Sequence, residues 1–209
     1  MNAEKVLTWS VAALGHLKNG ANGNAAEILD YLKTEAEAEI RRNAAKQSGN
    51  ANRQKAAERV IKSAKSTQRE ALHGSWIDSK GLQCICDGFQ AYRLREALPL
   101  ETIPEKETPL DLSRIIAENR GDLLTLPPVP ELKAHIKAEK ARKKAQKDKT
   151  APAWDFGEEL PQVNAEYLLN ALELLPDAIA IASRERPTLR AIYFKSEHGD
   201  GILLPVRKA

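Results

Sequence analysis

Residues 164–207 limit the fold most, because a helical pattern gives way there to three short strand patterns. Asn164 is a favourable helix N-cap, Glu166 lies in the first turn, and Pro176 ends the helical spacing. The apolar side chains of this helix share one face: Tyr167, Leu168, Ala171, Leu172 and Leu175. Strands are expected at 178–183, 189–196 and 201–207, with the turn sequence "EHGDG" between the last two. Antiparallel strands packed on a helix are therefore predicted.

A second change of periodicity lies upstream of this region. Trp76 and Ile77 are followed by a polar turn that ends at Gly81, and Cys84 and Cys86 then alternate with other side chains. This pattern predicts a strand, a glycine-containing turn and a second strand. A further strand is expected in "ALPLE", the segment that ends this region.

Cys84 and Cys86 are the two cysteines of the 209-residue chain. A Cys-x-Cys spacing on a strand puts both sulfur atoms on one face and leaves no disulfide framework, which favours a reducing cytoplasm. We interpret them as buried, small apolar side chains, with a catalytic Cys–His pair as the alternative. Neither a metal site nor a cofactor is predicted, because the four histidines show no ligand spacing: His16, His73, His135 and His198.

The N-terminal part of the chain is helical in pattern. Residues 3–18 predict a short core helix that "KNGANGN" ends, and Asn24 is the expected N-cap of a helix over 25–46. A second, basic helix is expected over 53–71. Its narrow apolar stripe predicts a helix that mostly faces solvent or a partner: Val60, Ile61 and Ala64. No apolar run approaches the length of a membrane span, so no membrane is expected as a partner.

The middle of the chain is less regular. Residues 98–131 are rich in proline, and a short helix is expected within them at 110–120. A very basic helix is predicted over 131–149, frayed at its C-terminal end. Residues 150–162 are expected to form a linker that Trp154 anchors.

Positive charge is concentrated in two segments. Residues 41–69 hold nine lysines and arginines against one acid, and residues 133–149 hold eight against two. Together they contain 17 bases and 3 acids, a charge of +14, which leaves −11 for the rest of a chain whose net charge is +3. Such segregation favours an anionic partner.

Three motifs resemble elements of one domain of the bacterial DNA polymerase sliding clamp. "CDGFQAYRL" is similar to the clamp's Thr-Asp-Gly-x-Arg-Leu strand end, with three more residues. "VNAEYLLNALELL" is similar to its closing helix, of Asn-x-x-Tyr-Leu-Leu-x-Ala-Leu type, and "GILLPVR" to its final Met-Pro-x-Arg strand. The resemblance covers residues 72–101 and 163–207.

The resemblance implies an α+β fold with one sliding-clamp-like domain of two halves, each a helix with antiparallel strands. Its expected parts are a helical N-terminal region at 1–71 that holds the first clamp-like helix and a basic extension, a first strand set at 72–101, a proline-rich and basic helical insertion at 102–162, and the second half at 163–209. It also implies a pocket for partner peptides between two walls. One wall consists of Gly88, Arg93 and Leu94, and the other consists of Pro205, Val206 and Arg207.

Clamps contact DNA phosphates through basic side chains on helices, without reading sequence. The resemblance therefore implies a non-enzymatic, cytoplasmic DNA-binding or replication-accessory protein, and the segregated charge favours binding to the phosphate backbone of double-stranded DNA. The candidate contacts are Arg41, Arg42, Arg53, Lys55, Arg59, Lys62, Lys137, Lys140, Lys143 and Lys144.

Two other classes of function are considered. One is a protein-binding module of phage or mobile-element origin, which docks on a bacterial replication, nuclease or defence complex. The other is an enzyme, which is not favoured because no set of nucleophile, base and orienting group and no glycine-rich phosphate loop is present. The oligomeric state is left open, with a homo-oligomer, a dimer and a monomer all compatible with the sequence.

Overall fold

The computed structural model describes residues 3–116 and 121–206, and the side chains from residue 6 onward. The chain divides into two compact units, Met1–Ala51 and Asn52–Ala209. Within the described residues, no helix is long and apolar enough to cross a membrane.

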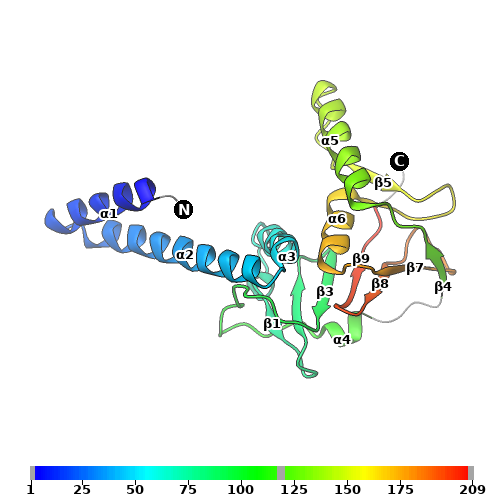
Figure 1. The fold of residues 1–209 in the computed structure, drawn as a ribbon, viewed down its shortest axis with the longest axis horizontal. Coiled ribbons are helices and arrows are strands. Elements are labelled where there is room, and N and C mark those ends of the chain that lie inside the picture. Colours follow the sequence, from blue (N-terminus) through cyan, green and yellow to red (C-terminus); the bar gives the residue numbers. More distant parts are fainter. Residues whose placement is uncertain (1–2, 117–120, 207–209) are drawn as a thin grey trace. The chain divides into compact units, whose positions relative to one another are not determined.

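The first unit is a helical hairpin. Helix α1 (Ala3–Lys18) and helix α2 (Asn22–Gln47) run in opposite directions (Figure 1). The expected helix over 3–18 is confirmed, but the expected N-cap at Asn24 is wrong, because α2 begins at Asn22, three residues earlier than expected, with Ala21 as its cap residue. Gly20 has a φ of 74°, and the Ala21 amide donates to the His16 carbonyl at 2.9 Å. This tight turn reverses the chain before Asn24 and so starts the helix sooner.

The second unit is built on a seven-stranded sheet in the order β1-β2-β3-β9-β8-β7-β4, in which every neighbouring pair is antiparallel. The strands are β1 (Trp76–Ile77), β2 (Gln83–Cys86), β3 (Gln90–Leu94), β4 (Gly121–Leu124), β7 (Ile179–Ser183), β8 (Ile192–Ser196) and β9 (Gly199–Leu203). The predicted α+β class and antiparallel sheet are confirmed. The predicted hairpin at β1 and β2 and the strand ends at Ser183 and Ser196 are confirmed as well.

The last strand begins earlier than expected. β9 starts at Gly199 rather than at Gly201, because the β8–β9 turn is formed by Glu197 and His198 alone. Opposite Gly201 lies Tyr92 of β3, and a Cβ atom at Gly201 would come within 2.4 Å of that ring. Glycine is therefore required here, since the buried ring fills the space where a side chain would lie.

Side chains alternate across the sheet and form two apolar clusters. On one face, Tyr92 and Phe194 pack with helices α3 (Ala51–Ala64), α5 (Val129–Ala145) and α6 (Ala165–Leu174). On the other face, Cys84 and Tyr193 pack with α4 (Leu112–Ile115) and the short 3₁₀ helix η1 (Glu70–Leu72). Both faces of the sheet are thus covered, and the three long helices share one of them.

Helix α3 is more deeply buried than its sequence indicated. Seven of its 14 residues are buried, including Ala56, Ala57 and Val60, so the expectation of a mostly exposed helix is wrong. Small alanine side chains let the helix lie close to the sheet and count as apolar contacts. The helix also ends at Ala64 rather than near residue 71, because the Thr67 hydroxyl donates to the Ala64 carbonyl at 2.7 Å.

The proline-rich segment contains structure that its sequence did not indicate. Strand β4 pairs with β7, and a Cβ atom on Gly121 would lie 1.7 Å from the Ala182 carbonyl oxygen. The short helix expected at 110–120 is present as α4, and residues 117–120 lie outside the described part of the chain. No strand forms at 97–101; instead the Gln83 side chain bonds to both the amide and the carbonyl of Leu98, at 2.7 and 2.8 Å.

The expected linker is partly a small hairpin. Strands β5 (Ala153–Asp155) and β6 (Gln162–Asn164) pair antiparallel before α6, a pairing that the sequence did not indicate. Trp154 packs partly buried against the core, which fits its expected anchoring role. Asn164 caps α6 as predicted: its Oδ1 accepts from the amides of Glu166 and Tyr167, at 2.9 and 3.4 Å.

Candidate nucleic-acid interface

Helix α5 carries a row of four lysines along one face. They are spaced by four, three and four residues, which places them side by side on a helix: Lys133, Lys137, Lys140 and Lys144. The helix is fixed at its base by Leu132 and Ile136, which are buried in the core. His135 adds a hydrogen bond to the Ala153 carbonyl at 2.7 Å and an edge contact to the Trp154 ring. Buried groups at the start of α5 therefore hold a basic helix in a set direction.

Every second lysine of the row is neutralised by α6. The Lys133 Nζ lies 2.6 Å from Glu173 Oε1, and the Lys140 Nζ lies 2.6 Å from Glu166 Oε1. The two lysines are seven residues apart on α5, and their two glutamate partners are seven residues apart on α6 in the reverse order. The two helices are therefore antiparallel. Lys137 and Lys144 are exposed and form no ion pair with any residue that the structure describes.

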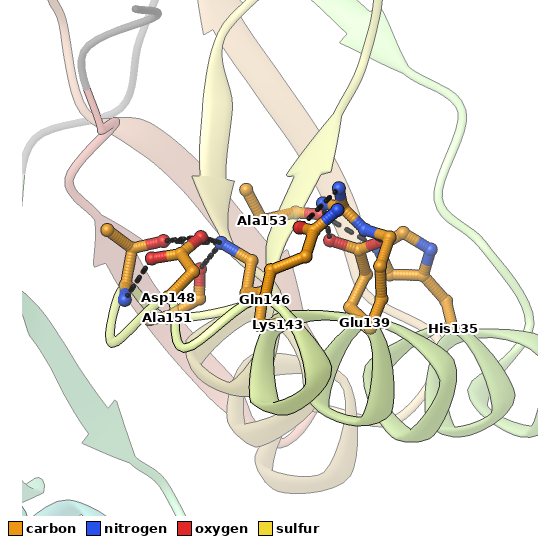
Figure 2. Close-up of polar contacts among 9 residues, drawn as sticks. His135, Glu139, Lys143, Gln146, Asp148, Ala151 and Ala153 are labelled. Carbon is orange, nitrogen blue, oxygen red and sulfur yellow. Dashed lines mark hydrogen bonds and ion pairs between the residues drawn. The ribbon is translucent and has the colours of Figure 1, made fainter.

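The C-terminal end of α5 is ordered rather than frayed, so that expectation is wrong. Lys147 takes a φ of 55°, and the Asp148 amide donates back to the Lys143 carbonyl at 2.9 Å. This is a helix-ending turn of the Schellman kind. Figure 2 shows the Lys143 side chain reaching over it, where the ammonium donates to the Ala151 carbonyl at 3.1 Å and lies 3.3 Å from Asp148. Lys143 thus fastens the turn.

Beside this turn lies an open hollow of about 740 Å³. Its charged lining consists of five lysines and two carboxylates: Lys140, Lys143, Lys144, Lys147, Lys149, Asp148 and Glu166. The surplus of positive charge makes this end of α5 favourable for an anion. Lys147 and Lys149 were missed as candidates, although they follow Lys144 in the same basic run.

Helix α3 presents a second basic row. Lys55, Arg59 and Lys62 are spaced by four and three residues and lie on its exposed face. Arg59 turns toward α6, where its Nε donates to Asn170 Oδ1 at 2.7 Å and its Nη2 binds Glu173. Lys55 and Lys62 form no ion pair within the described residues. The acidic edge of α6 thus lies between two basic rows, and each row retains lysines that α6 does not neutralise.

Three of the candidate arginines lie elsewhere. Arg53 is 4% exposed, and it donates to the Leu174 carbonyl at 3.1 Å and to Glu96 at 2.7 Å. Its hydrogen bond to Glu96 holds the pKa of that carboxyl below its usual range. Arg41 and Arg42 are on α2, in the other unit, and Arg41 lies 3.8 Å from Glu37. Arg53 therefore supports the fold from within, and the basic rows of α3 and α5 do not include it.

The candidate pocket residues fall at two ends of the β3–β9 pair. Leu94 lies opposite Gly199, and Arg93 binds Asp200. Arg93 and Leu94 are both buried, at the end of the strand pair that contains Gly199. At the other end, the Leu204 amide donates to the Phe89 carbonyl at 2.9 Å, which places the turn at Gly88 beside Pro205 and Val206. Arg207 lies outside the described residues. Among the described residues, the structure therefore brings Gly88 close to Pro205 and Val206, while Arg93 and Leu94 lie at the opposite end of the strand pair.

An apolar surface does occur at the second end. Phe89 is 56% exposed and stacks on Tyr167 of α6 with ring centroids 6.2 Å apart, and Leu204 and Val206 are also exposed. Sequence reasoning missed Phe89 and Tyr167 as members of one surface, because the contact joins residues 78 positions apart.

The two cysteines are buried, as expected. Cys84 is fully buried and Cys86 is 6% exposed, and both belong to the cluster on the face opposite the long helices. Burial raises the pKa of the Cys84 thiol to about 12 and also raises the pKa of Cys86. Neither thiol is thereby activated as a nucleophile. Among the described residues, no group of histidine, cysteine, aspartate and glutamate is arranged to hold a metal ion.

Comparisons with protein-family models, with curated proteins and with solved structures found no match to this chain. The comparisons therefore add no support to the resemblance to one sliding-clamp domain, which was drawn from the three sequence motifs.

Proposed function

We propose that this protein binds the phosphate backbone of double-stranded DNA, without sequence preference, through the basic rows of α3 and α5. The observation that carries the proposal is the incomplete neutralisation of these rows. Lys133 and Lys140 are paired with α6, whereas Lys137 and Lys144 beside them are exposed and unpaired within the described residues. When unpaired lysines neutralise DNA phosphates, the counterions condensed on the DNA are released. This release is the main source of non-specific affinity.

The choice of side chain supports contacts to phosphate rather than to bases. Lysine is a flexible point charge without the rigid fork of an arginine, and a contact to a phosphate oxygen needs no fixed geometry. The exposed members of the two rows are mainly lysines, and Arg59 already donates to α6. A surface of this kind positions a protein on DNA without specifying a sequence.

The order of elements supports a clamp-like role. Helix α3 is followed by β1, β2 and β3, and α6 is followed by β7, β8 and β9. The resemblance to a clamp domain implies two halves, each a helix with antiparallel strands. We therefore propose a replication-accessory role, in which α3, α6 and α5 form the DNA-facing side of the second unit.

The test is a titration of two unrelated duplexes at several salt concentrations, followed by fluorescence anisotropy. The double variant Lys137→Glu/Lys144→Glu should weaken binding of both duplexes to the same degree and lower the salt slope by about 0.9 for each lost phosphate contact. The matched control is Lys80→Glu/Arg190→Glu, which makes the same charge change at exposed positions in two loops. Binding of the unaltered protein no tighter than about 10⁻⁴ M at near-physiological salt would end the proposal.

A second candidate function is docking on a protein partner, which the apolar surface of Phe89, Tyr167, Leu204 and Val206 favours. Exposed aromatic and aliphatic side chains in one patch are typical of protein interfaces. The variant Phe89→Ser separates the two functions, because it should leave DNA binding unchanged and abolish docking. A loss of DNA affinity in Phe89→Ser would count against this assignment of the patch.

A further inference from the structure

A polar strip on α6 holds basic side chains of both neighbouring helices. Its members are spaced by four and three residues, which places them along one face of the helix. Glu173 binds Arg59 of α3 and Lys133 of α5. Glu166 binds Lys140 of α5. The strip therefore offers negative charge to cations of both basic rows, and it consists of Glu166, Asn170 and Glu173.

The C-terminal end of the strip is fixed by buried hydrogen bonds. Glu173 is 9% exposed and Asn170 is 4% exposed. The Asn170 amide nitrogen donates to Gln90 Oε1 at 3.4 Å, and the Gln90 amide nitrogen donates to Asp87 Oδ2 at 2.8 Å. Because the nitrogen of Asn170 is used in this way, its oxygen accepts from Arg59. The contacts at this end cannot exchange without leaving buried polar groups unpaired, which is costly.

The N-terminal end of the strip is open to solvent. The side chains of Lys140 and Glu166 are 55% and 44% exposed, although their charged atoms lie 2.6 Å apart. Exposed ion pairs contribute little to stability, because water competes for both charges and two side chains lose their freedom. The Lys140–Glu166 contact therefore needs much less free energy to break than the contacts of Glu173.

Both members of the exposed pair have another favourable environment. Glu166 lies in the first turn of α6, where the positive end of the helix dipole favours a carboxylate even without a lysine. Lys140 lines the same hollow as Lys144 and Lys147. The lysine side chain is long and rotates freely, so its ammonium can turn from Glu166 toward an anion in this hollow.

We propose that Glu166 regulates the DNA interface by competing with phosphate for Lys140. In the free protein the carboxylate holds the ammonium, and in the complex a DNA phosphate takes its place. Glu173 keeps its contacts in both states, so α3, α5 and α6 stay together while one lysine changes partner. The exchange lowers the affinity for DNA but keeps the number of phosphate contacts. The lysines of α5 that contact phosphate are then Lys137, Lys140 and Lys144.

This inference rests on the proposed function, because the competing ligand is DNA phosphate. Two behaviours of Lys140 are distinguished by experiment. If Lys140 changes partner, the unaltered protein already makes this phosphate contact. If Lys140 stays with Glu166, the contact forms only after the carboxylate is removed. The salt slope of binding counts phosphate contacts and so separates the two behaviours.

The experiment measures binding of a duplex to the full-length protein by fluorescence anisotropy at several salt concentrations. Glu166→Gln should bind about two- to fivefold more tightly, because no carboxylate competes for the lysine, and its salt slope should equal that of the unaltered protein. Lys140→Ala should lower the slope by about 0.9. In the double variant Lys140→Ala/Glu166→Gln, the second change should no longer give this gain, because the lysine at issue is absent.

The matched control is Glu131→Gln, which makes the same charge change on α5. Glu131 is exposed, lies two residues before Lys133 of the row, and forms no ion pair with any residue that the structure describes. Its replacement reduces the general repulsion toward DNA but releases no lysine. The gain in affinity should therefore be smaller than the gain in Glu166→Gln. Far-UV circular dichroism of each variant verifies that its helices remain folded.

Two results would overturn the competition and leave the proposed DNA binding intact. One is an equal gain in Glu131→Gln and Glu166→Gln, which would show general repulsion alone. The other is a slope that rises by about 0.9 in Glu166→Gln and is unchanged in Lys140→Ala, since Lys140 would then stay paired in the complex.

The limit of detectable binding separates this inference from the proposed function. If neither the unaltered protein nor Glu166→Gln binds the duplex more tightly than about 10⁻⁴ M, both proposals fail. Binding by Glu166→Gln alone would support the competition, whereas the proposed function of the unaltered protein would fail.

Discussion

Arg59 on α3 and Lys133 on α5 bind different oxygen atoms of one carboxylate, that of Glu173 on α6. The Lys133 Nζ lies 2.6 Å from Oε1, while Arg59 binds Oε2. Glu173 is 9% exposed, so this carboxylate joins three helices at the edge of the core. The two basic rows thus flank α6 because both are tied to the same buried acid.

The Glu173 carboxylate should make folding stability depend on pH. Burial acts to raise its pKa, but the hydrogen bonds and charges of Lys133 and Arg59 outweigh it, and the pKa is lowered. Glu173 therefore stabilises the fold above the unfolded pKa, near 4.3, and this contribution is lost as pH falls through the lower folded value. Urea unfolding of Glu173→Gln should show a loss of about 1–2 kcal/mol at pH 7, since both partners are half-exposed.

The same variant provides the check on the cause. Glutamine keeps the size of the side chain but has no charge to lose, so the difference between Glu173→Gln and the unaltered protein should shrink as pH falls below about 4.3. A difference that stays constant from pH 7 to pH 3 would show that packing, and not the ion pairs, is responsible.

Two leucines of α6 should differ in their contribution to stability. Leu168 is fully buried, whereas Leu172 is only partly buried against the same cluster. Leu168→Ala should cost about 2–5 kcal/mol, and Leu172→Ala should cost less, because water can fill part of the space that it leaves. Chemical denaturation of both variants measures the two losses. Equal losses would contradict the burial of Leu168 relative to Leu172.

The sequence predicted the second half of the sheet well because its signals are local. Asn164 caps α6 through its own side chain, and β7 and β8 end where their alternation ends, at Ser183 and Ser196. These features depend on neighbouring residues and so can be read from a short stretch of sequence.

The features that could not be predicted depend on distant partners. Strand β4 is a strand because Gly121 allows close approach to Ala182 of β7, and nothing in its own sequence signals this. Helix α3 is buried because alanines let it approach the sheet, which a count of large apolar residues overlooks. One long-range signal was present: Lys133 and Lys140 are seven residues apart, as are Glu166 and Glu173. The sequence does not say that these two helices are neighbours.

The two thiols should react only when the protein unfolds. Because burial raises the pKa of Cys84 to about 12, its thiolate is scarce at pH 8, and both sulfur atoms are shielded from solvent. Alkylation by iodoacetamide should be slow in the native protein and fast in denaturant. The raised pKa also means that Cys84 favours folding fully below its unfolded pKa, near 8.5, and that this contribution is lost as pH rises above it. Rapid modification of either thiol in the native protein would contradict this prediction and favour the alternative hypothesis of a reactive cysteine.

Neighbouring lysines of α5 should have separable roles in binding and folding. Lys137 is exposed and unpaired within the described residues, whereas Lys143 is held by Asp148 and the Ala151 carbonyl. Lys137→Ala should therefore lower the salt slope of DNA binding by about 0.9 and leave unfolding unchanged. Lys143→Ala should leave the slope unchanged and destabilise the fold by up to about 1 kcal/mol, because the turn that ends α5 loses its fastening. Salt titrations and urea unfolding of the two variants compare these effects directly, and an equal fall in slope for both would show that Lys143 leaves its intramolecular partners to bind phosphate.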